Sequence, residues 1–135
     1  MTAEDEAFLA AFESCRLLPE AWTHAAHIRM AWLCLGAEAY AGALERIRRG
    51  ILRYNEQVLD KLPEYHETVT VAFARIIASR MRPGEEWTSF AQHNEDLFAR
   101  TPPALSSYYS MELLMSPQAR RSFVEPDLKP LPEPG

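Results

Sequence analysis

The chain has 135 residues, 47% of them hydrophobic and 24% charged, which is sufficient for one globular domain with a single core. Its formal net charge of −5 argues against a general nucleic-acid binder, which needs a basic surface. No apolar run approaches the roughly 18 residues of a membrane span, and the acidic N-terminus does not look like a signal peptide, so we expect a cytoplasmic protein without a membrane partner.

Apolar residues recur at helical spacing along most of the chain, and candidate N-caps or proline-containing breaks separate the periodic stretches. The predicted helices are residues 2–15, 23–35, 40–58, 63–81, 87–98, 110–115 and 116–123. The first, second, sixth and seventh of these helices have as candidate N-caps Thr2, Thr23, Ser110 and Ser116. The second has a single charged residue, Arg29, which indicates a central position in the core. The third has the most regular seam, at Tyr40, Leu44, Ile47, Ile51, Tyr54 and Val58.

Strand-like alternation appears nowhere, so the predicted class is all-α. Four prolines between Pro126 and Pro134 favour an extended tail, with Leu128 and Leu131 as candidate anchors. We predict a single helical domain over residues 1–125, with a four-helix up-down core, a fifth helix and short C-terminal helices. An extended Pro-rich tail follows over residues 126–135.

Two further groups of residues fit structural roles. Arg46, Arg49 and Arg53 share one face of the third helix, and Glu45 lies four residues before Arg49. This arrangement favours a solvated helix face with an i,i+4 ion pair over an anion site. The two cysteines form no CxxC pair and lie among apolar residues, which predicts buried reduced thiols and excludes a zinc ribbon.

Three of the four histidines fall in the opening turns of two apolar helices. His24 and His27 are three residues apart and therefore neighbours on one face, and His66 begins the apolar face of the fourth predicted helix. In an up-down bundle the second and fourth helices run parallel, so their N-terminal turns lie at the same end. The three imidazoles are then expected to converge, whereas His93 lies off the apolar stripe and is predicted to be a surface residue.

Three histidines around an open position form a zinc arrangement used for hydrolysis, and imidazole also suits iron, copper and nickel. Glu67, beside His66, is the first choice for an added carboxylate ligand or general base, with Glu13 or Glu64 as alternatives. Trp22 and Tyr65 are candidates for substrate binding. Tyr108 and Tyr109 precede a capped helix and are candidate proton donors.

These residues predict a small metal-dependent enzyme, a hydrolase or an oxygenase, that acts on a small molecule and holds zinc, iron, copper or nickel. The alternative is a non-catalytic binding or interaction module, in which the histidines form hydrogen bonds within the core and apolar helices associate as a homodimer. A third possibility is a metal-free pocket that binds an anion at the helix N-termini.

Several sequence blocks carry a family resemblance. They are residues 22–32 (WTHAAHIRMAW), 65–70 (YHETVT), 108–110 (YYS) and 116–128 (beginning SP and ending FVEPDL). These blocks resemble those of a small uncharacterised bacterial family of all-helical proteins. The resemblance implies a bacterial origin and a compact helical domain, and it supplies no activity, cofactor or site residue.

Overall fold

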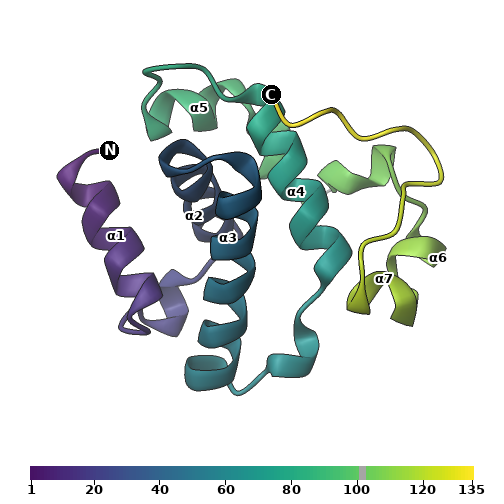
Figure 1. Ribbon diagram of the computed structural model, residues 1–135, viewed down its shortest axis with the longest axis horizontal. Helices are drawn as coiled ribbons and strands as arrows, with labels where there is room; N and C mark the ends of the chain where they lie inside the picture. The colour runs from purple at the N-terminus through teal and green to yellow at the C-terminus, as the bar shows by residue number, and fades with distance from the viewer. Residues whose placement is uncertain (101–102) are drawn as a thin grey trace. The chain divides into compact units, whose positions relative to one another are not determined.

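The computed structural model describes residues 1–100 and 103–135, and these ranges form helices and no β-strand (Figure 1). The all-α class predicted from the sequence is confirmed. The α-helices are α1 (Ala3–Glu13), α2 (His24–Ala37), α3 (Tyr40–Tyr54), α4 (Glu67–Arg80), α5 (Trp87–His93), α6 (Met111–Leu114) and α7 (Pro117–Arg121). Short 3₁₀ turns occupy Pro19–Ala21, Leu62–Glu64, Glu95–Leu97 and Ala104–Ser107.

The chain divides into two compact units, residues 1–65 and residues 66–135. The first unit contains α1, α2 and α3, and the second contains α4 to α7 and the tail. The four-helix up-down core is not confirmed, and the single domain over residues 1–125 stays a prediction.

Three helix boundaries differ most from those predicted. The third helix gives way after Tyr54 to a π-helical turn, Asn55–Leu59, which apolar spacing alone does not distinguish from an α-helix. The fourth helix starts at Glu67, because Pro63 belongs to a separate 3₁₀ turn and the N-cap is His66. The fifth helix ends at His93 instead of Phe98, since the Asn94 side chain donates to the carbonyl of Phe90 (2.8 Å).

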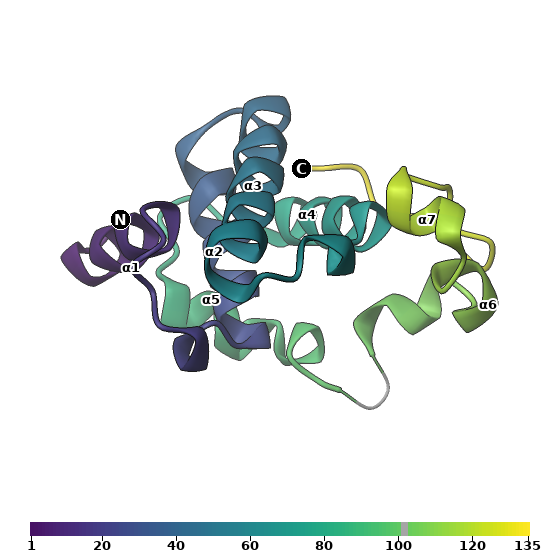
Figure 2. The same ribbon diagram turned by 90° about the horizontal axis from the view of Figure 1, so that it is seen from below.

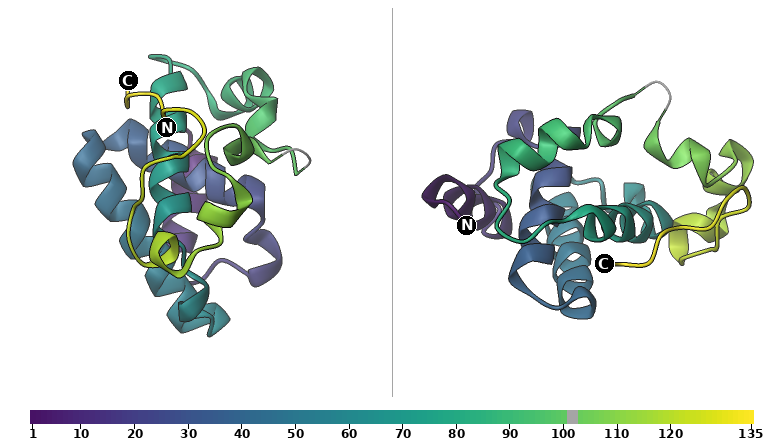
Figure 3. Two further views of the ribbon diagram at one scale, coloured as in Figure 1. Left: turned by 90° about the vertical axis from the view of Figure 1, so that its right-hand side faces the viewer. Right: turned by 90° about the horizontal axis from the view of Figure 1, so that it is seen from above.

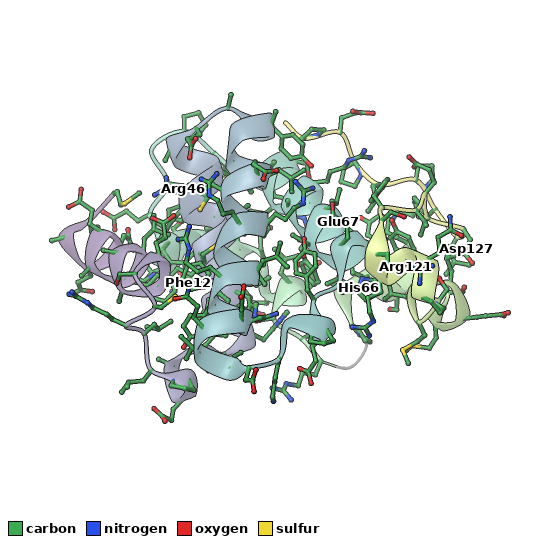
Figure 4. The ribbon with its side chains drawn as sticks, turned by 60° about the horizontal axis from the view of Figure 1, so that its bottom comes forward. Phe12, Arg46, His66, Glu67, Arg121 and Asp127 are labelled. Carbon is green, nitrogen blue, oxygen red and sulfur yellow. The ribbon has the colours of Figure 1, made fainter. Side chains whose placement is uncertain are left out.

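In the first unit, Phe12 of α1 lies at the centre of the core, 1% exposed, and faces Gly50 of α3. The two helices are also joined by charge, since Arg46 donates to both carboxylate oxygens of Glu13 (2.7 and 2.8 Å). Figure 4 labels Phe12 and Arg46 on these elements. The hydrogen bonds from Arg46 lower the pKa of Glu13, which keeps this carboxylate ionised.

The basic face of α3 is therefore less solvated than the sequence indicates. Besides Glu13, Arg46 also reaches Glu38 (3.2 Å). Glu45 pairs with Arg48 three residues away (2.6 Å) instead of the predicted partner Arg49. Arg46 and Arg53 thus hold α1 and α3 together, since Arg53 donates to the carbonyl of Glu13 (3.1 Å), whereas Arg49 is exposed.

The two cysteines have different environments. Cys34 is buried, at 1% exposed, and burial raises the pKa of its thiol to about 12, as expected for an inert core residue. Cys15 is half-buried and follows α1 in the left-handed conformation (φ 62°). Both thiols are reduced.

In the second unit, α7 and the 3₁₀ turn Ala104–Ser107 pack on α4, and α6 packs on α7. After α7 the chain runs back along α4 without forming a helix (Figures 2 and 3). Leu131 is buried there, at 9% exposed, whereas Leu128 is 58% exposed. Gly135 lies beside the carbonyl of Ala78, near the end of α4.

We predict that Gly50→Ala destabilises the protein. A Cβ at this position would lie 2.7 Å from Cε2 of Phe12, and the buried ring has little room to move. We expect the free energy of unfolding to fall by about 1–3 kcal/mol, although alanine is the better helix former. Thermal or urea unfolding followed by circular dichroism measures the change.

The matched control is Gly42→Ala in the same helix. Gly42 is exposed, and its added Cβ would meet only the end of the flexible Glu38 side chain, at 3.3 Å. Alanine there should raise stability by about 0.5–1 kcal/mol. Equal effects of the two substitutions would contradict the close approach of Phe12 to Gly50.

Candidate functional site

His27 is oriented by the chain that precedes its helix. The Thr23 side chain caps α2 by accepting a hydrogen bond from the backbone N–H of Ala26 (3.2 Å). The backbone carbonyl of Thr23 forms a second hydrogen bond, with Nδ1 of His27 (2.8 Å). A carbonyl oxygen only accepts, so Nδ1 carries the proton and Nε2 carries the lone pair. His24, the first residue of α2, is half-buried one turn away.

The ring face of His27 packs in an aromatic cluster in the first unit. Its ring stacks on Trp22, with centroids 3.7 Å apart. Trp22 in turn stacks on Phe12 (4.4 Å) and contacts Tyr54 (5.3 Å). Trp22 is only 8% exposed, so the predicted substrate-binding tryptophan lies mainly within the core.

Burial lowers the pKa of His27, and the nearby His24 lowers it further, while the hydrogen bond to the Thr23 carbonyl opposes the shift. The folded protein therefore favours the neutral imidazole at this position. Neutral imidazole is the form that ligates metals, but it is also the usual form of a buried structural histidine.

His66 uses both ring nitrogens on backbone groups of the second unit. As the N-cap of α4, it accepts the N–H of Val69 at Nδ1 (3.2 Å). Its Nε2 donates to the carbonyl of Leu114 at the end of α6 (2.7 Å). A metal ion could bind His66 only if one of these hydrogen bonds were broken.

The predicted carboxylates lie at different places. Glu67 is the first residue of α4, half-buried beside His66 (Figure 4), and Glu64 is exposed in the preceding 3₁₀ turn. Glu13 is held by Arg46 through both oxygens. Its lowered pKa makes it a weaker base than an ordinary glutamate.

Two of the predicted tyrosines, Tyr108 and Tyr109, contact the C-terminal segment. Tyr109 is 2% exposed, and its hydroxyl donates to the carbonyl of Val124 (2.7 Å). Burial raises its pKa to about 12. The carbonyl of Tyr108 accepts the N–H of Leu128 (2.9 Å), and the ammonium of Lys129 lies 5.0 Å above the Tyr108 ring. Tyr65 is half-buried at the end of the first unit.

Thr68 contacts the same C-terminal segment as Tyr109 and was not singled out from the sequence. Its side chain is fully buried, donates to the carbonyl of Ser122 (3.0 Å) and accepts the N–H of Val124 (3.2 Å). The available signal was its place in the block YHETVT, where a polar residue stands next to the apolar face of a helix. Thr68 and Tyr109 thus bind backbone groups of the segment that follows α7, and His66 binds the last residue of α6.

The three predicted metal ligands are divided between the units, with His24 and His27 in the first and His66 in the second. Within residues 1–100 and 103–135, no group of three or more His, Cys, Asp or Glu side chains is placed to hold a metal ion. His93 is exposed, as predicted, and pairs with Glu85 (3.0 Å).

No helix in the described part of the chain has the length and apolar character to cross a membrane. No protein-family model matches the sequence, and no curated protein or solved structure matches it either. The bacterial origin and the cytoplasmic location therefore stay predictions.

We predict that His27 makes stability pH-dependent. Because its pKa is lower in the folded than in the unfolded chain, the unfolded chain takes up a proton first as the pH falls below 6.5. The contribution of His27 to the free energy of unfolding should therefore fall from there down to the folded-state pKa, and level off below it. In His27→Gln, urea unfolding at a series of pH values should show a shallower fall, and an unchanged slope would refute the role of His27.

We predict that Thr68→Val loosens the C-terminal segment. Valine has the same shape but leaves the Ser122 carbonyl and the Val124 N–H without their partner. Each such buried group costs about 1–3 kcal/mol, so we expect a loss of about 2–4 kcal/mol. Hydrogen exchange should also become faster at Val124.

Thr70→Val in the same helix is the control. The Thr70 hydroxyl donates to the carbonyl of His66, which already accepts the backbone N–H of Thr70. Its loss should cost less than about 1 kcal/mol and leave exchange at Val124 unchanged. Equal losses in both variants would show that the Thr68 hydroxyl does not hold the segment.

Proposed function

We propose that this chain is a non-catalytic helical interaction module whose histidines are structural. The observation that carries the proposal is the use of both His66 nitrogens, one by Val69 and one by Leu114. A side chain used in this way connects two segments and offers no lone pair to a ligand.

The remaining candidate groups support the same conclusion. Tyr109, with its pKa raised to about 12 and its hydroxyl on the Val124 carbonyl, is a poor proton donor near neutral pH. The ionised carboxylate of Glu13 is held in an ion pair by Arg46. Trp22 is covered by aromatic neighbours. Each of these side chains has a structural partner that a catalytic role would have to displace.

A metal-dependent enzyme, a hydrolase or an oxygenase acting on a small molecule, stays a second candidate because of His27. Metal-ligating histidines commonly donate one ring N–H to a carbonyl or carboxylate, which fixes the other nitrogen toward the metal. The Nδ1 bond from His27 to Thr23 has this form, and His24 lies three residues away on the same helix. Zinc, iron, copper or nickel would then be bound by this pair with further ligands.

Metal analysis of untagged protein separates the two candidates. For the interaction module we expect less than stoichiometric metal as purified, and no change in melting temperature with added zinc, iron, copper or nickel. Stoichiometric metal that is lost in His24→Ala and His27→Ala would instead establish a metal site at this pair and favour the metal-dependent enzyme.

Substitution of His66 tests the structural role directly. Asparagine is a good N-cap, so His66→Asn should retain the cap on α4 and lose only the bond to Leu114. His66→Ala loses both and should be less stable than His66→Asn by about 0.5–2 kcal/mol in thermal unfolding. Equal stability of the two variants would remove the capping role from the proposal.

A further inference from the structure

The Pro-rich C-terminal tail lies against two elements of the second unit. Near its start, the ammonium of Lys129 lies 5.0 Å from the centre of the Tyr108 ring. At its far end, Gly135 lies beside the carbonyl of Ala78, in the last turn of α4. Between these contacts the tail follows α4 (Figure 3), and Leu131 is buried there, at 9% exposed. We refer to the surface from Tyr108 to Ala78 that the tail covers as the tail site.

The sequence of the tail restricts its conformation. Prolines at positions 130, 132 and 134 alternate with other residues, so every residue from 129 to 134 is a proline or precedes one. Proline holds φ at about −65°, and the residue before a proline is directed to the extended region. A segment of this kind loses little conformational entropy when it docks, which is why extended proline-rich peptides are common ligands of proteins.

The attachment of the chain changes in kind at Leu128. Up to this residue hydrogen bonds hold the chain, since Tyr109 donates to the carbonyl of Val124 (2.7 Å) and Leu128 donates to the carbonyl of Tyr108 (2.9 Å). Beyond it the prolines have no N–H to donate, and the backbone groups along α4 are used within the helix. Burial of Leu131 therefore holds the end of the tail, which can leave α4 while the earlier hydrogen bonds keep the unit folded.

The tail site has the chemistry of a surface that binds such a peptide. The ring of Tyr108 is half-buried under Lys129, and aromatic side chains are characteristic of surfaces that hold proline-rich peptides. The chain also approaches the backbone of α4 closely, because a Cβ on Gly135 would lie 2.8 Å from the carbonyl oxygen of Ala78. The tail, with a leucine between two prolines as its buried residue, is thus bound in the manner of a peptide ligand.

Resting on the proposed function, we propose that the tail site binds an extended proline-rich peptide of a partner protein, and that the tail occupies this site as an intramolecular ligand. The partner peptide carries a leucine between two prolines, which takes the place of Leu131. The docked tail keeps the site closed, and the partner peptide competes with it for the same surface. The interaction module is therefore inhibited by its own C-terminal segment.

Fluorescence anisotropy with a labelled peptide of residues 127–135, added to the full chain, tests the site. Leu131→Glu places a charge at the buried position, so the tail of this variant should leave the site and the peptide should bind. The native chain should bind the peptide at least ~10-fold more weakly, because its site is open for only a fraction of the time. Leu128→Glu is the matched control, since Leu128 is 58% exposed, and this variant should behave as the native chain. Circular dichroism checks that each variant is folded.

The same two substitutions in the peptide identify the residue that the site recognises. Binding to the Leu131→Glu chain should be lost with the Leu131→Glu peptide and retained with the Leu128→Glu peptide. A folded Leu131→Glu chain that binds no peptide, equal binding by this chain and the native chain, or equal binding of the two substituted peptides would overturn the proposal.

Sedimentation velocity excludes an exchange of tails between two copies. The native chain should be a monomer, and a native dimer that dissociates in Leu131→Glu would overturn the intramolecular closure. Metal content does not enter these experiments, so a failure of the peptide site is distinguishable from a failure of the non-catalytic assignment.

Discussion

The second unit depends on the requirement that a buried backbone group must have a hydrogen-bond partner. After α6 the chain forms only one further short helix, α7, and then none to its end, so few backbone groups there are paired within a helix. Side chains supply the missing hydrogen-bond partners. Thr68 binds the carbonyl of Ser122 and the N–H of Val124, Tyr109 binds the carbonyl of Val124, and His66 binds the carbonyl of Leu114. This requirement explains why polar residues occupy positions that an enzyme site would also use.

The same requirement limited what could be inferred from the sequence. The all-α class and the N-caps Thr2, Thr23, Ser110 and Ser116 follow from periodicity and local hydrogen bonding, and both were predicted correctly. Local signals did not reveal that His66 caps α4, because histidine is not among the residues preferred at N-caps. Nor does any local signal connect Thr68 with a segment more than fifty residues away.

The candidate site was harder to predict than the fold, and for a specific reason. The spacing of His24 and His27 correctly places both in the first turn of α2. The expected convergence with His66 depended on a four-helix topology, which local periodicity does not determine. The partners of each imidazole then decide its chemistry: His27 keeps a lone pair at Nε2, whereas His66 has both nitrogens engaged.

The burial of Cys34 makes this thiol a reporter on the first unit. A neutral thiol with a pKa of about 12 inside the core reacts with an alkylating reagent only when the surrounding helices open. With the half-buried Cys15 replaced by serine, the rate of labelling would follow the opening of α1, α2 and α3 under native conditions. The second unit contains no cysteine, so thiol labelling would report the opening of the first unit without any signal from the second.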